Sequence, residues 1–173
     1  MKNLTMVLFV LACLLLPAAN VLSQKATHSF GFNAARISGF PSGAAFLTGG
    51  GAYDPESGFL KTGGAFRCLE DINQGPLRGC NAGEGIRWDA VELLPSTGFK
   101  CSGSAGEALK TAVTDDNTIV MRADFYRQGD GINESFTAKM FVSAVDEAPE
   151  LPGIQNVWIE GVGCAEGAIA NFR

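Results

Sequence analysis

The side chains best able to do chemistry are concentrated between residues 67 and 89, which carry three arginines, one tryptophan and two cysteines. The carboxylates of this stretch form two candidate pairs, Glu70 with Asp71 and Glu84 with Asp89. Glycosidases use such pairs as general acid and base. The alternative is a structural network in which Arg67 and Arg87 neutralise these carboxylates. We expect the network, because nothing in the sequence brings a pair to catalytic separation.

Binding is a second possible use of the same stretch. Trp88 stands between Arg87 and Asp89, and pockets for small molecules combine apolar walls with a few such polar groups. A loop closed by a disulfide is also a common place for binding residues. The ligand-binding candidates here are therefore Arg67, Arg87, Trp88 and Asp89.

A further polar set lies on a predicted strand pair, residues 118–127 with 135–143. Apolar residues alternate with polar ones along both segments, which is the pattern of strands with one buried face. The apolar set is Ile119, Met121, Ala123, Phe125, Phe136, Ala138, Met140 and Val142. Pairing Tyr126 with Ser135 places Asp124 between Arg122 and Lys139, which it would bridge diagonally. Arg122, Asp124 and Tyr126 complete the candidate ligand-binding set, although a solvated face with weak ion pairs is the favoured interpretation.

Histidine chemistry is improbable, because His28 is the single histidine of the chain. A Ser-His-Asp or Cys-His site would have to use it, and no G-x-S-x-G motif accompanies it. We therefore assign no catalytic residue. A calcium ion needs several oxygen ligands, and residues 115–117 or 130–134 could supply only two or three each. We therefore expect no metal site and no cofactor.

The N-terminal residues predict export. Lys2 precedes an apolar run from Met6 to Leu16, which Pro17 ends, and small residues precede a cleavage point between Ser23 and Gln24. This layout is typical of a signal peptide, residues 1–23. Attachment of a lipid at Cys13 is the less favoured alternative, because cleavage there would split the apolar run. We expect a secreted or periplasmic protein.

The remaining residues, 24–173, have the size of one domain. Removal of residues 1–23 changes the net charge from −5 to −6, because Lys2 is their only charged residue. An acidic chain without basic runs lacks the footprint of a nucleic-acid or membrane-surface binder. We therefore expect no nucleic-acid partner and no membrane contact after cleavage, and the oligomeric state stays open.

Four cysteines lie beyond residue 23: Cys68, Cys80, Cys101 and Cys164. In an exported chain an even number favours two disulfides, with three possible connectivities. A zinc site built from four thiolates is the alternative. Structural zinc sites usually take their cysteines from close C-x2-C pairs. No two of these cysteines are closer in sequence than Cys68 and Cys80, which do not form such a pair. Disulfides are therefore expected.

The elements that must position these residues are all strands. Short runs rich in Phe, Val, Ile and Thr alternate with turn residues, as in all-β domains. The predicted strands are His28–Ile37, Ala44–Tyr53, Phe59–Leu69, Ile86–Leu94, Lys110–Thr114, Thr118–Arg127, Ser135–Ser143, Asn156–Val162 and Ala168–Phe172. A glycine-rich near-repeat flanks the turn at 54–58 and predicts a hairpin that coils sharply or is crossed by a bulky ring. We expect an antiparallel β-barrel of eight to nine strands, with a β-sandwich as the alternative.

The run from Gly63 to Ile72, with its continuations at 74–77, 85–89 and 123–127, resembles a family of small secreted bacterial proteins of uncharacterised function. The resemblance implies a bacterial exported protein and carries no activity, ligand or catalytic residue. The expected barrel also resembles, in outline only, calycin-like and allene-oxide-cyclase-like barrels.

Three functions remain open for such a barrel. A small barrel can hold one ligand, so binding of a small, partly apolar molecule without catalysis leads. The second is an enzyme, either a barrel isomerase or cyclase or a carboxylate-dependent carbohydrate-active enzyme. The third is a structural or surface-interaction module. An open interior with Arg122 or Tyr126 pointing inward would favour the first two, and a filled interior the third.

Overall fold

The computed structural model describes residues 28–38, 43–126 and 135–173. The predicted signal peptide and the strand end at Arg127 lie outside the described residues. The strands are β1 (His28–Ser38), β2 (Ala44–Asp54), β3 (Phe59–Glu70), β4 (Arg87–Leu94), β5 (Ser96–Phe99), β6 (Lys110–Val113), β7 (Thr118–Tyr126), β8 (Ser135–Ser143), β9 (Gln155–Ile159), β10 (Gly163–Glu166) and β11 (Ile169–Phe172). No helix capable of crossing a membrane occurs in the described part of the chain.

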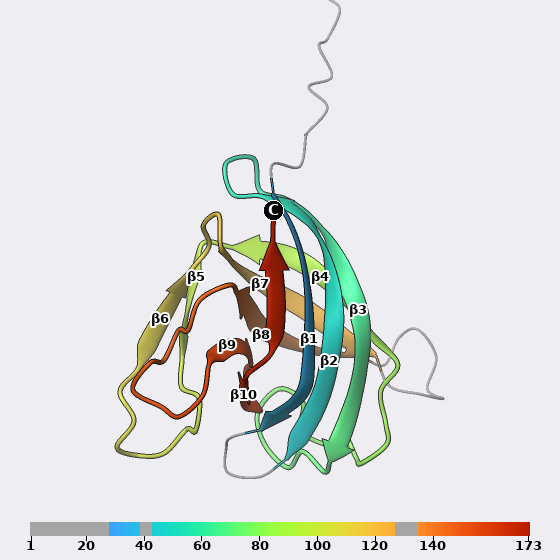
Figure 1. The fold of residues 1–173 in the computed structure, drawn as a ribbon. Coiled ribbons are helices and arrows are strands. Elements are labelled where there is room, and N and C mark those ends of the chain that lie inside the picture. The colour runs from blue at the N-terminus through green and yellow to red at the C-terminus, as the bar shows by residue number, and fades with distance from the viewer. Residues whose placement is uncertain (1–27, 39–42, 127–134) are drawn as a thin grey trace, which may run out of the picture.

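The main sheet is antiparallel and closes on itself, which confirms the barrel (Figure 1). Its order is β10-β9-β8-β7-β4-β3-β2-β1-β11, and β1 pairs additionally with β10 through Ile37 and Ala165. Eight strands thus form a closed barrel, and β11 is an extra strand that pairs with β1. The sandwich alternative is therefore wrong.

The alternation along β7 and β8 predicted their register correctly. Tyr126 pairs with Ser135, Asp124 with Thr137 and Arg122 with Lys139. The alternate apolar residues of both strands lie in the core inside the barrel, most of them fully buried. Because side chains in a strand point to opposite faces in turn, the polar residues between them lie on the outer surface.

The interior of the barrel is packed with large side chains. Trp88, Phe66 and Phe125 are each at most 2% exposed and belong to one core cluster. The glycine-rich hairpin makes room for the largest of them, as the sequence predicted. A Cβ on Gly49 would lie 2.7 Å from the Trp88 ring and 2.5 Å from the Gly63 carbonyl oxygen. The Trp88 indole donates a hydrogen bond to the Thr48 carbonyl at 3.1 Å, so its polar atom is satisfied.

A second core lies outside the barrel. The flap, residues 96–113 with the hairpin of β5 and β6, stands beside the barrel wall (Figure 1). Phe99 of the flap packs edge-on against Phe141 of β8 at 4.8 Å between ring centroids and lies near Trp158 of β9. Consecutive residues of β7, β8 and β9 are buried for this reason. Strands buried on both faces lose the alternating pattern.

Two strands were not predicted. β5 has only four residues, and the strand predicted as Asn156–Val162 ends at Ile159, which leaves β10 as a separate, unpredicted strand. Gly161 instead has a φ of +80° and lies in the turn between β9 and β10, a conformation that glycine adopts readily. β4 pairs with β7, and the flap is inserted between them in the sequence.

Both disulfides are present. Cys68 pairs with Cys80, and Cys101 pairs with Cys164. The first closes the loop after β3, and the second joins the flap to β10. Separate cysteine pairs leave no four-thiolate zinc site.

Candidate functional site

Six of the seven candidate binding residues lie on the outer surface of three adjacent strands. Arg67 belongs to β3, Arg87 and Asp89 belong to β4, and the remaining three belong to β7. The register pairs Arg87 with Tyr126 and Asp89 with Asp124. The structure therefore brings these polar side chains onto one face of the barrel wall. Trp88, in contrast, is fully buried inside the barrel and cannot contact a ligand on this face.

Most of these side chains already have a partner on that face. Arg87 Nε lies 3.2 Å from Asp89 Oδ2, and the Arg87 guanidinium stacks 4.6 Å from the centre of the Tyr126 ring. Asp124 accepts a hydrogen bond from the Thr137 hydroxyl at 2.6 Å. Ion pairs at half-exposed positions contribute little stability, so this arrangement is the solvated polar face that the sequence favoured.

The predicted diagonal bridge from Asp124 to two cations is replaced by another pair. Arg122 pairs with Glu92 of β4. A bulge between Ala90 and Glu92 shifts the register of β4 and places Glu92 opposite Arg122. Cross-strand neighbours on one face interact most directly, and for this reason the nearer Glu92 is preferred.

The candidate acid–base carboxylates are also engaged in structural contacts. Glu70 forms an ion pair with Arg36 of β1 at 2.5 Å. Asp71 accepts a hydrogen bond from the Ala82 amide at 2.9 Å, and Glu84 accepts one from the Asn81 amide at 2.9 Å. These bonds hold the loop that the Cys68–Cys80 disulfide closes, so the contacts are structural, but of the expected arginine–carboxylate network only the pair of Arg87 with Asp89 is present. The partner of Glu70, however, is Arg36 and not Arg67.

Arg67 differs from the other arginines of the barrel wall. Arg36, Arg87 and Arg122 each pair with a carboxylate, whereas no described carboxylate pairs with Arg67. Arg67 is exposed and lines a surface hollow of about 530 Å³. The Arg67 hollow is formed by Ala35, Phe46, Ala65, Phe66, Arg67, Leu69, Gly85 and Ile86.

The walls of the Arg67 hollow are apolar. Ile86 is 54% exposed and Leu69 is 37% exposed, and Phe46 of β2, which also lines the hollow, is half-buried. Phe66 also lines the hollow. Its backbone amide donates a hydrogen bond to the Ile86 carbonyl at 3.3 Å, which joins the two strands. One unpaired cation beside exposed apolar side chains can bind a molecule that has an anionic group and an apolar body. The hollow contains no nucleophile and no carboxylate.

A second opening, the seam groove, lies where β1, β10 and β11 meet. Its volume is about 720 Å³. Its walls include the Cys101–Cys164 disulfide, Ser102 of the flap and the loop residues Leu151 and Pro152. Sequence reasoning missed this groove, because its walls come from four segments that only the closed barrel brings together.

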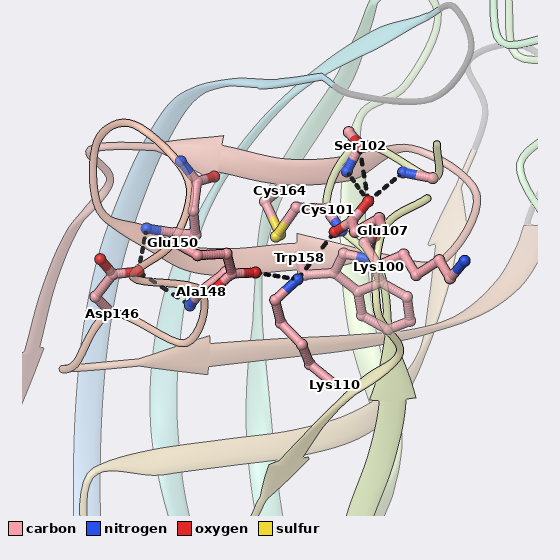
Figure 2. Close-up of a disulfide and its surroundings, with 12 residues drawn as sticks. Lys100, Cys101, Ser102, Glu107, Lys110, Asp146, Ala148, Glu150, Trp158 and Cys164 are labelled. Atoms are coloured by element: carbon pink, nitrogen blue, oxygen red, sulfur yellow. Dashed lines mark hydrogen bonds and ion pairs between the residues drawn. A yellow bond between two sulfur atoms is a disulfide. The ribbon is translucent and has the colours of Figure 1, made fainter. Parts of the chain in front are cut away.

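Beside the seam groove, a buried carboxylate holds the flap loop (Figure 2). Glu107 accepts hydrogen bonds from the amides of Cys101, Ser102 and Gly103 at 2.6–2.9 Å. Lys110 lies 3.1 Å from Glu107 and 2.5 Å from Glu150. Burial raises the pKa of Glu107, but the hydrogen bonds from Ser102, Cys101 and Lys110 outweigh it and lower the pKa to about 2. An acid this strong stays ionised and cannot donate a proton near neutral pH.

His28 has a structural environment. Its ring lies 5.3 Å from the ring of Tyr53, and its Nε2 lies 3.4 Å from Asp116. Tyr53 is buried and donates a hydrogen bond to the Asp115 carbonyl. Burial, followed by the charges of Asp115 and Asp116, raises the pKa of the Tyr53 phenol. Tyr53 is therefore a core side chain whose phenol stays neutral.

Within the described residues, no cluster of three or more His, Cys, Asp or Glu side chains could hold a metal ion. The acidic stretch 130–134 lies outside these residues. No protein-family model matches the sequence, and comparison with curated proteins and with solved structures finds no significant match.

Proposed function

We propose that this protein is an exported, non-catalytic binding module that takes a small amphipathic anion in the Arg67 hollow. The observation that carries the proposal is the Arg67 guanidinium, which pairs with no carboxylate among the described residues and lies beside the exposed side chains of Leu69 and Ile86. Export is supported by the two disulfides, which persist in oxidising compartments.

The interior of the barrel is filled, which is the feature expected of a surface-interaction module and not of a barrel that holds its ligand inside. We therefore place the ligand on the outer surface of the barrel. Arg122 and Tyr126 lie on the outside of the barrel, and large side chains occupy the inside. A ligand held within the barrel, as in lipocalin-type barrels, would have to displace the Trp88 cluster. The Arg67 hollow requires no displacement, and its volume of about 530 Å³ falls in the usual range for small-molecule sites.

Binding without catalysis is favoured by the residues that form the hollow. Arg67 is their only charged member, and their other side chains are aliphatic, aromatic or absent. A guanidinium can hold a carboxylate or a phosphate through two parallel hydrogen bonds. It cannot act as a general base, because it stays protonated.

The test uses titration calorimetry with two matched probe sets: medium-chain and aromatic carboxylates, and the neutral amides of the same compounds. We expect the carboxylates to bind and the amides to bind more weakly. Arg67→Gln should weaken carboxylate binding about two- to fivefold, as expected for one exposed ion pair, and leave amide binding unchanged. Ile86→Ser should weaken both sets.

The matched control is Arg122→Gln, which removes a cation from the same face of the barrel wall but not from the hollow. It should bind the carboxylates like the unmodified protein. Equal affinity for acids and amides, or equal losses in Arg67→Gln and Arg122→Gln, would overturn the proposal.

A further inference from the structure

The outer edge of β11 pairs with no strand in the described part of the chain. β11 pairs with β1 on one side only, and Figure 1 shows it standing at the front of the barrel beside β1. Its residues, Ile169 to Phe172, include no charged residue and no proline. Natural sheets usually protect a free edge with lysine, proline or a bulge. β11 carries none of these three devices, and its only protection of this kind is its short length of four residues.

The hydrogen-bond pattern shows which groups the edge presents. Ser29 and Arg173 exchange both backbone hydrogen bonds, each at 2.8 Å. Asn171 and Ile169 are the next residues of β11 in the same phase, opposite Gly31 and Asn33. In an antiparallel pair, alternate residues point their amides toward the partner strand. Ala170 and Phe172 therefore point their N–H and C=O groups away from β1, and no described residue bonds to these groups.

This edge is complementary to itself. If two copies of β11 pair antiparallel about Asn171, Ala170 of each copy lies opposite Phe172 of the other. This register uses the outward N–H and C=O groups of Ala170 and Phe172 in both copies, and it gives four backbone hydrogen bonds. Ala170 and Phe172 both pack on the core side, so each small alanine leaves room for the ring opposite it.

The outer side of the same strand fits the same pairing. Asn171 would face its own copy, and an amide can donate to and accept from a second amide. Ile169 is 69% exposed, and Ile154, whose carbonyl accepts a hydrogen bond from the Gly167 amide, is 52% exposed. In the pairing, Ile169 would be covered by the stem of Arg173 from the other copy.

We infer that the protein self-associates through β11, forming a two-fold symmetric dimer in which two barrels share one continuous sheet. The occupant is a second copy of this chain, because the edge matches itself in hydrogen bonding, in side-chain volume and at Asn171. An interface of one short strand is small, so the dimer is weak and depends on concentration. The inference is independent of the ligand proposed for the Arg67 hollow, which involves other strands.

The experiment is analytical ultracentrifugation of the full chain over a range of protein concentrations. The unmodified protein should shift from monomer to dimer as its concentration rises. Because residue 171 faces its own copy, Asn171→Lys and Asn171→Glu should each stay monomeric through like-charge repulsion. An equimolar mixture of the two variants should dimerise again.

Ala170→Pro gives a second measurement, because it removes an outward N–H without removing a bond to β1. It should abolish the dimer, with circular dichroism confirming the fold. Thr111→Lys, an exposed substitution on β6, is the charge control and should dimerise normally. A protein that stays monomeric at every concentration overturns the inference, as does an Asn171→Lys variant that dimerises alone.

Discussion

Replacing Glu107 by glutamine should destabilise the protein in a pH-dependent way. The Glu107 side chain is only 5% exposed and is bound by three backbone amides, the Ser102 hydroxyl and Lys110 (Figure 2). Its pKa falls from an ordinary 4.5 to about 2, the hydrogen bonds outweighing the opposing effect of burial. At about 1.4 kcal/mol for each pKa unit, the ionised form stabilises the folded state by about 3 kcal/mol.

The sign follows from the direction of this change. The folded-state pKa lies below the unfolded one, so the stabilisation is complete above pH 4.5 and is lost as the pH falls toward 2. Glu107→Gln should therefore lower the free energy of unfolding by about 3 kcal/mol at neutral pH and by much less near pH 2. The glutamine side chain would also point its own N–H donor at backbone N–H groups that donate hydrogen bonds to Glu107.

The assay is urea unfolding followed by tryptophan fluorescence, since Trp158 donates a hydrogen bond to the Lys100 carbonyl of the flap. Glu150→Gln is the matched control, because Glu150 contacts the same Lys110 from an exposed position. It should unfold like the unmodified protein. A Glu107→Gln variant as stable as the unmodified protein at neutral pH, or a deficit that is the same near pH 2, would refute the reasoning.

Three further substitutions test the packing. Phe125→Ala should cost about 3–5 kcal/mol in thermal or urea unfolding because Phe125 is fully buried, whereas the half-exposed Arg122→Ala should cost less than about 1 kcal/mol; the reverse order would mean a shifted register. Gly49→Ala should lower the melting temperature strongly, because its Cβ would meet the Trp88 ring, whereas Gly58→Ala should show only the milder strain of a φ of +73° in open space; equal losses would contradict this packing. Cys101→Ser opens a disulfide between residues 63 apart and should lower the free energy of unfolding by about 4 kcal/mol in the chain-entropy model. If reducing agent leaves the unfolding of the unmodified protein unchanged, the disulfide does not provide this stabilisation.

The parts of the fold that were predictable are those with one buried and one exposed face. β7 alternates from Arg122 to Tyr126 and β8 alternates from Ser135 to Met140, and so their register could be deduced from the sequence. β5 and β10 have only four residues each, too few for a periodic pattern to emerge. The flap covers the outside of β7, β8 and β9, and a strand buried on both faces carries no alternation to predict which side faces the barrel.

The candidate site was predictable in part for the same reason. Arg87 and Asp89 point outward, so alternation itself places Trp88 inward, against the interpretation that grouped all three. Arg67 could be selected from the sequence, but its apolar neighbours could not. Phe46 and Ala35 come from β2 and β1, and their approach depends on the curvature of the closed barrel.

Closure between β1 and β10 has a consequence for how the chain reaches its final state. The contact between Ile37 and Ala165 joins segments near opposite ends of the described chain, and the Cys101–Cys164 bridge also needs β10. As the chain emerges from a ribosome or an export channel, β1 and β2 appear before the later strands. The free edge of β1 stays unpaired until β10 and β11 have emerged. Folding should therefore be slow, as in other proteins dominated by distant contacts. During this delay the exposed flank of β1 is the segment most in need of a chaperone.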